Sequence, residues 1–299
     1  MLSRSSSRLF ALAVALALPC AAARGQQARL DVLHIGATGT LTGDADSQKE
    51  KGAVQTLRRF IKDETGFTND IVRQGDWQQL ADKMKRGELH VGVFQGYEFA
   101  WAQEKHPDLK PLAIAVNSQR YPVAYVLAQR DNPAKDFAGL KGQSLCLPIT
   151  NQEFLRLFVN RQSEANGKKA DAFFDKLTTP DNVEDALDDV VNGKVRAVVV
   201  DGAALEAYQR RKPGRARRLK EVARSGPFPP AVVAYYGSTL DEATRRLFRD
   251  GLVGAAKKEK GEMLLTLSRL TGFEDVPEDF AKVLGKTRKA YPPPAAKSK

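Results

Sequence analysis

The sequence predicts an α/β protein of two lobes, each a mostly parallel sheet flanked by helices. Short apolar runs alternate with longer segments whose apolar residues recur every three or four positions, which is typical of this class. The clearest case is an amphipathic segment from residue 183 that ends at Gly193, followed by the β-branched run of residues 195–200. A strand that is apolar on both faces needs helices above and below it, as in a parallel sheet. The 299 residues exceed the usual length of a single core, which favours two lobes.

Strand and helix alternate along most of the chain. Asp76 is the predicted N-cap of the helix that follows it, and Thr179 with Pro180 is predicted to begin the helix that ends at Gly193. We expect strands at residues 31–35, 70–73, 89–94, 111–116, 121–129, 143–147, 195–200, 219–223 and 231–236. We expect helices at residues 48–63, 77–86, 99–105, 152–163, 180–192, 202–208, 241–256, 262–270 and 277–289.

Two segments are expected to cross between the lobes, near residues 117–121 and 225–230. They assign residues 30–117 and 228–290 to the first lobe and residues 118–227 to the second. Two lobes joined by two segments make a hinge, with a ligand in the cleft between them. The proline-rich tail, residues 291–299, is expected to be disordered.

The first 23 residues have the features of a cleaved signal peptide. Two arginines flank a serine-rich start, an apolar run of about ten residues follows, and small residues end the segment at Ala23. The alternatives are a buried first helix and lipid attachment at Cys20, although Pro19 fits a lipoprotein cleavage site badly. After cleavage Cys146 is the single cysteine, so no internal disulfide is expected, and a buried apolar role suits it.

The mature chain would carry 45 basic and 36 acidic residues, a net charge of +9. This excess favours an anionic partner, which could be a small ligand, a membrane surface or a nucleic acid. For an exported protein we expect no nucleic acid. The densest charge is the basic run at residues 210–218, which is either a docking surface for a membrane or transporter or a solvated loop.

Several segments resemble a known family. The turn Asp-Phe-Ala-Gly-Leu-Lys-Gly at residues 136–142, and Asn-Gly-Lys-Val-Arg-Ala-Val-Val-Val-Asp at residues 192–201, are similar to the second lobe of type 2 periplasmic substrate-binding proteins. Within that group the chain most resembles the phosphate/phosphite/phosphonate-type binding proteins of ABC importers. Residues 92–97, 228–234, 270–273 and 277–280 support this, and the resemblance covers residues 32–284.

The resemblance implies a two-lobed, periplasmic-binding-protein-like (type 2) fold with two hinge crossings. One segment departs from the family. Phosphonate-type proteins have a Ser-Thr-Ser-Gly-like stretch that holds the anion, whereas residues 148–152 here read Pro-Ile-Thr-Asn-Gln. A family histidine near the next helix is matched only by the region of residues 179–182. The resemblance therefore implies a small polar or anionic solute and leaves its identity open.

Three strand-to-helix turns are predicted to face the ligand, at residues 37–40, 95–97 and 150–152. Amide groups at a helix start bind an anion or a carbonyl oxygen, and glycine lets the backbone approach closely. Tyr97 and Tyr121 could wall the pocket and Asp201 could accept a hydrogen bond, although packing or capping is the alternative for each. The candidate ligand-binding residues are Thr38, Gly39, Thr40, Gln95, Gly96, Tyr97, Tyr121, Thr150, Asn151, Gln152 and Asp201.

Signals for catalysis or metal binding are poor. The glycines of residues 36–43 have neither dinucleotide nor phosphate-loop spacing, and no Gly-x-Ser-x-Gly elbow occurs. His34, His90 and His106 are expected to stand alone, and a solvated loop suits Asp44 and Asp46 better than a cation site. We therefore predict no enzyme activity, no metal and no cofactor.

These observations predict a periplasmic, monomeric solute-binding protein that delivers its ligand to an ABC permease in the inner membrane. The alternative is a sensory or partner-binding module of the same fold that signals to a membrane receptor. An extracytoplasmic enzyme has little support.

Overall fold

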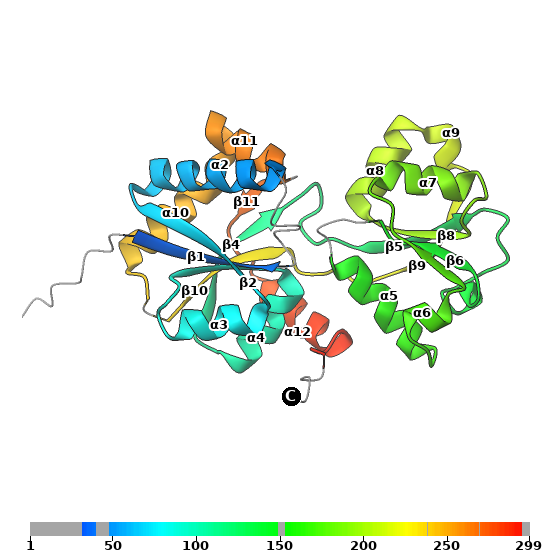
Figure 1. The fold of residues 1–299 in the computed structure, drawn as a ribbon, viewed down its shortest axis with the longest axis horizontal. Helices are drawn as coiled ribbons and strands as arrows, with labels where there is room; N and C mark the ends of the chain where they lie inside the picture. Colours follow the sequence, from blue (N-terminus) through cyan, green and yellow to red (C-terminus); the bar gives the residue numbers. More distant parts are fainter. Residues whose placement is uncertain (1–31, 40–47, 149–152, 238, 269, 295–299) are drawn as a thin grey trace, which may run out of the picture. The chain divides into compact units, whose positions relative to one another are not determined.

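The computed structural model describes residues 32–39, 48–148, 153–237, 239–268 and 270–294, and within them it contains two mixed sheets (Figure 1). The first sheet has the order β11-β4-β10-β3-β1-β2. Its strands are β1 (Val32–Thr38), β2 (Thr68–Gln74), β3 (Val91–Phe94), β4 (Leu109–Val116), β10 (Ala231–Tyr236) and β11 (Gly272–Glu274). The second has the order β7-β6-β8-β5-β9. Its strands are β5 (Ala124–Gln129), β6 (Ser144–Cys146), β7 (Lys176–Thr178), β8 (Ala197–Asp201) and β9 (Leu219–Arg224).

Helices cover both faces of each sheet, as Figure 1 shows. On the first sheet, one face carries α2 (Gln48–Thr65), α10 (Glu242–Val253) and α11 (Glu259–Ser268), and the other carries α3 (Trp77–Lys85), α4 (Gly96–Lys105) and α12 (Phe280–Ala290). On the second, α5 (Glu153–Ala165) and α6 (Ala170–Phe173) lie opposite α7 (Val183–Val191), α8 (Gly202–Arg211) and α9 (Pro213–Ala216). The 3₁₀ turns are η1 (Ala138–Leu140) and η2 (Ala255–Lys257).

Both sheets are mixed, and most strands of each run in the same direction, as expected. Pairing is parallel in β2-β1-β3 and β7-β6-β8, whereas β10 and β5 are antiparallel to both of their neighbours. The physical reason is the path of the chain. It leaves the first sheet after Val116, enters the second at Ala124, and returns from Arg224 to Ala231. The first strand after each crossing, β5 or β10, therefore runs opposite to the strands that it pairs with.

The predicted helix boundaries are right where a single residue dominates the local geometry. Asp76 caps α3 by accepting a hydrogen bond from the amide of Gln79 at 2.9 Å, as expected. Gly193 follows α7 with φ of +75°. The prediction that Thr179 and Pro180 begin α7 is wrong, because the side chain of Asn182 accepts from the amide of Glu184 at 2.8 Å and the helix starts one residue later than that cap.

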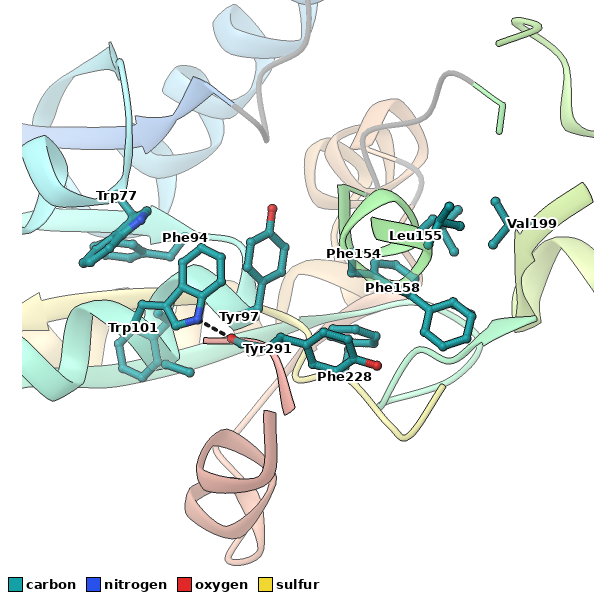
Figure 2. Close-up of a cluster of buried hydrophobic side chains, with 14 of the residues drawn as sticks. Trp77, Phe94, Tyr97, Trp101, Phe154, Leu155, Phe158, Val199, Phe228 and Tyr291 are labelled. Atoms are coloured by element: carbon teal, nitrogen blue, oxygen red, sulfur yellow. Dashed lines mark hydrogen bonds between the residues drawn. The ribbon is translucent and has the colours of Figure 1, made fainter. Parts of the chain in front are cut away.

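A continuous aromatic and aliphatic cluster connects elements of both sheets. Phe228, in the return crossing, lies 5.1 Å from Phe154 of α5 and 4.6 Å from Tyr291 between ring centroids. The indole of Trp101 in α4 donates a hydrogen bond to the carbonyl oxygen of Tyr291 at 2.7 Å (Figure 2). Tyr291 is buried, so the predicted disordered tail begins too early, and residues 295–299 lie outside the described part.

Some features were not anticipated. The three-residue strands β7 and β11 were missed, because so short a segment has no readable periodicity. Part of the basic run forms α9 rather than a loop. Among the described residues, no helix is long and apolar enough to cross a membrane.

Candidate ligand-binding site

The predicted site residues cluster at the carboxyl ends of strands. In the first sheet Thr38 ends β1 opposite Gln74, and β3 ends beside it at Phe94. In the second sheet Cys146 ends β6 and Asp201 ends β8. Since parallel neighbours end at the same edge of a sheet, each sheet brings its predicted turns together at one edge.

The first turn starts later than predicted. Residues 36–38 continue β1, where they pair with β2 throughout, instead of forming a loop after residue 35. Thr38 is fully buried and Gly39 is half-buried, while Thr40 lies outside the described part. Thr38 is therefore a strand residue whose side chain is covered, and Gly39 is the first position at which the turn opens.

Arg73 is a residue at this edge that the sequence reasoning missed. It is the last residue but one of β2, next to the first turn, and its guanidinium Nη2 donates to the carbonyl oxygen of Gly39 at 3.3 Å. The side chain is exposed. The signal for it would have been the pairing of β2 with β1, which puts residue 73 beside residue 37.

The start of α4 is built from Gln95, Gly96 and Tyr97. The amide of Gln95 donates to the carboxylate Oε2 of Glu98 at 3.2 Å in a capping box, so this helix start already has a negatively charged partner. The expectation of freely available amides is therefore wrong at Gln95. A Cβ on Gly96 would collide with the carbonyl oxygens of Pro229 and Pro230, so only glycine lets α4 begin this close to the return crossing.

Tyr97 packs within the cluster of Figure 2. Its ring meets Trp101 edge-on at 5.0 Å between centroids, and only 6% of the residue is exposed. Burial raises the pKa of the Tyr97 phenol far above its ordinary value, and the charges of Glu98 and Glu153 raise it further.

The start of α8 repeats the arrangement at α4. Asp201 is buried and accepts a hydrogen bond from the amide of Ala204 at 2.6 Å as the N-cap. A Cβ on Gly202 would collide with the side-chain oxygen of Gln119, which lies in the outward crossing. Gln119 in turn donates to Glu206 of α8 at 2.6 Å. Each of these two helices thus begins with a glycine against a crossing segment.

Tyr121 is tied to the C-terminal part of the chain. Its hydroxyl donates to Oδ1 of Asp279 at 2.5 Å, and the preceding Arg120 forms an ion pair with Glu274 at 2.5 Å. Burial, together with this hydrogen bond, raises the pKa of Tyr121 to about 12. The phenol therefore has a carboxylate partner before any ligand arrives.

The third predicted turn cannot be placed. Thr150, Asn151 and Gln152 lie outside the described part of the chain. What is described is the helix that follows them, α5, which begins at Glu153 and buries Phe154.

The described residues hold no group of three or more His, Cys, Asp or Glu side chains arranged for a metal ion. Two histidines do not stand alone, contrary to expectation. His34 and His90 stack at 5.3 Å, and His34 Nδ1 lies 2.7 Å from Asp70 Oδ1. This pair lies toward the amino ends of β1 and β3, away from the predicted turns. Cys146 is buried, and burial raises the pKa of its thiol.

Residues 40–280 match the family described as ABC transporter, phosphonate, periplasmic substrate-binding protein. The chain belongs to this family. The match includes strands of both sheets and both crossing segments. It makes the protein a periplasmic-type solute-binding protein of an ABC importer, in a family whose members bind and deliver solutes.

Solved structures share the fold at low sequence identity. A Xanthomonas citri protein bound to chloride ion is 17% identical with a TM-score of 0.62, covering 87% of this chain and 97% of its own. PhnD1 from Prochlorococcus marinus in complex with methylphosphonate is 12% identical with a TM-score of 0.59, covering 87% and 98%. A binding protein component of an ABC phosphonate transporter from Pseudomonas aeruginosa is 15% identical with a TM-score of 0.55, covering 87% of each chain. No match was found among curated proteins.

Proposed function

We propose that this protein captures a small anionic or polar solute between its two lobes and hands it to an ABC permease in the inner membrane. The observation that supports this most is the family match over residues 40–280, which includes strands of both sheets and both crossings. The predicted lobe boundaries, residues 30–117 with 228–290 and residues 118–227, are part of the proposal.

The proposed solute site uses the three turns unequally. Carboxylates already accept hydrogen bonds from the amides of Gln95 and Ala204, so these helix starts are poor places for a second negative charge. We therefore assign the anionic group of the solute to the turns at residues 38–40 and 150–152. The remainder of the solute would contact Gln95, Gly96, Tyr97, Tyr121 and Asp201.

The energy of such a site is sufficient. A hydrogen bond to a charged group contributes about 1.5–3 kcal/mol, and micromolar affinity needs about 8 kcal/mol. Three or four amide or hydroxyl groups from the two turns, with Arg73 adding positive charge nearby, would reach that range before ordering costs.

The predicted signal peptide indicates where the protein works. We propose that residues 1–23 are removed on export and that the mature protein works as a periplasmic monomer. A small solute with a phosphonate-type oxyanion is the first class to test, because PhnD1 was solved with methylphosphonate.

The test is titration with methylphosphonate, phosphite and phosphate, followed by melting temperature and by tryptophan fluorescence, to which Trp101 contributes beside the ring of Tyr97. A solute at about 100 times its Kd should add about 2.7 kcal/mol to the free energy of unfolding. Tyr97→Phe keeps the ring but removes the hydroxyl, and we expect it to raise Kd about tenfold or more if the phenol donates to the solute.

Tyr236→Phe is the control, because this half-buried tyrosine of β10 is outside the proposed site. We expect it to leave Kd unchanged within about twofold. Deletion of the gene should also abolish uptake of the bound solute. If none of the three oxyanions shifts the melting temperature, the proposed ligand class is wrong, and intact uptake in the deletion strain would argue against the transport role.

A further inference from the structure

The structure divides the basic run of residues 210–218 into two parts with different surroundings. In the first part, three cations face carboxylates on α7. Arg211 pairs with Glu184 at 2.5 Å, and Lys212 and Arg215 each pair with Asp188 at 2.6 Å. These charges are compensated within the fold.

The second part is not compensated in this way. Arg217 and Arg218 are exposed, and they line the same hollow as Arg130, which follows β5. None of the three forms an ion pair with a carboxylate in the described ranges. Together with Gln129 and Asp131 they line a hollow of about 340 Å³.

The backbone around this hollow is held in place. The amide of Arg130 donates to the carbonyl oxygen of Arg218 at 2.8 Å, and Arg130 Nε donates to the carbonyl oxygen of Arg217 at 3.0 Å. Nearby, Lys220 Nζ donates to the carbonyl oxygen of Asn132 at 2.5 Å. The Nε contact orients the Arg130 guanidinium, whose terminal nitrogens form no hydrogen bond with the described residues.

The hollow is far from the proposed solute site. Gln129, at one end of β5, pairs with Leu219, whereas Ala124, at the other end, pairs with Asp201. Five residue steps along a strand span about 17 Å. A solute at the carboxyl ends of β6 and β8 cannot reach the three arginines.

We propose that this hollow is a second binding site, specific for a phosphomonoester-type group. Guanidinium groups bind phosphate oxygens through paired hydrogen bonds, which lysines cannot reproduce. Three arginines and Asp131 give a net charge of +2, which matches a phosphate dianion better than a carboxylate. The group could belong to a free phosphomonoester or to a lipid headgroup.

The test uses glycerol 3-phosphate in calorimetry and phosphatidic acid in phosphatidylcholine vesicles in flotation. Arg217→Gln with Arg218→Gln should weaken binding at least tenfold. The matched control is Lys282→Gln with Lys286→Gln, which removes the same charge from exposed positions on α12. We expect the control to stay within about twofold of the wild type. Arg130→Lys keeps the charge but loses the Nε contact, so its affinity for the probes should lie between those of the two double variants.

Each outcome decides the proposal. If the arginine double variant, and not the control, loses glycerol 3-phosphate binding, the ligand is a free phosphomonoester. If the arginine double variant loses only its flotation with the vesicles, the ligand is a lipid headgroup. Equal losses in both double variants, or no binding of either probe to the wild type, would overturn it. Methylphosphonate binding read from Trp101 fluorescence should be unchanged in the arginine variant, so a failure here leaves the proposed transport function untouched.

Discussion

At the level of single residues, two glycines stand out because each begins a helix against a crossing segment. Gly96 is held against backbone, the carbonyl groups of Pro229 and Pro230, whereas Gly202 meets the side chain of Gln119. A side chain can move away from an added methyl group more easily than backbone carbonyl groups can. Substitution by alanine should therefore be tolerated less well at Gly96 than at Gly202.

Gly96→Ala tests the contact with the backbone. The added methyl group overlaps two carbonyl oxygens, and overpacking of this kind costs about 1–3 kcal/mol of unfolding free energy. Thermal melts would measure it. Gly285→Ala in α12 is the control, since nothing lies within 4 Å of its added Cβ and alanine favours helix by up to about 1 kcal/mol. If Gly96→Ala and the wild type have the same melting temperature, the backbone of the return crossing shifts to accommodate the added methyl group.

Residues also show why the candidate site was only partly predictable. The positions of Gly96 and Asp201 at strand-to-helix junctions follow from local pattern. The contacts of site residues do not follow from local pattern, because the partners are distant in sequence. Gly96 contacts Pro229, and Tyr121 contacts Asp279, which is 158 positions away. Arg73 was missed for the same reason, since only strand pairing brings it to Gly39.

At the level of elements, α7, α8 and α9 are joined by one partly buried carboxyl group. Asp188 accepts hydrogen bonds from Lys212 at 2.6 Å, from the Tyr208 hydroxyl at 2.6 Å and from Arg215 at 2.6 Å. Burial acts to raise the pKa of Asp188, but these three donors outweigh it and lower the pKa to about 2. The carboxylate thus remains charged throughout the physiological range.

Asp188→Asn should make stability less sensitive to acid. Because the pKa of Asp188 is lower in the folded chain than its ordinary 3.8, its contribution is full above about pH 4 and is lost as the pH falls toward 2. We expect the variant to lose about 1 kcal/mol at pH 7, measured by urea unfolding, with the difference shrinking below pH 4.

Asp181→Asn is the matched control, because Asp181 is exposed and forms no ion pair with the described residues. Its stability should follow that of the wild type from pH 7 to pH 2. A constant gap between Asp188→Asn and the wild type over that range would argue against a charged Asp188 as the link.

Elements were predicted well where periodicity and caps agree, as at α3 with Asp76 and at the end of α7 with Gly193. The reversed direction of β5 and β10 could not be predicted. An alternation of strands and helices suggests parallel pairing, yet β5 and β10 are each the first strand after a crossing and run antiparallel to their neighbours. Thr179 and Pro180 have the right chemistry for a helix start, but Asn182 caps α7.

At the level of the whole molecule, residues distant in sequence complete one cluster. Tyr291 follows the last helix and lies against Phe228 of the return crossing, while its carbonyl oxygen accepts from Trp101 of α4. Arg161 of α5 also donates to the carbonyl oxygen of Ala290 at 3.1 Å. The end of α12 is therefore in contact with elements of both sheets.

A chain ending at Ala290 should be markedly less stable than one ending at Pro294. The shorter chain loses the buried Tyr291 ring and the acceptor for the Trp101 indole, and removal of a buried aromatic side chain costs about 3–5 kcal/mol. Melting temperature and a red shift of Trp101 emission would report the loss. If both truncated chains behave like the full chain, Tyr291 is dispensable.

The contact of Gly96 with Pro229, and of Gly202 with Gln119, has a consequence for engineering. Substitutions in the crossings should alter affinity for the solute although they never touch it, because the backbone at Pro229 and the side chain of Gln119 bear on the helix starts that line the proposed pocket. Selection for tighter or weaker capture could therefore act at Gln119 or Pro229 while the pocket itself keeps its specificity.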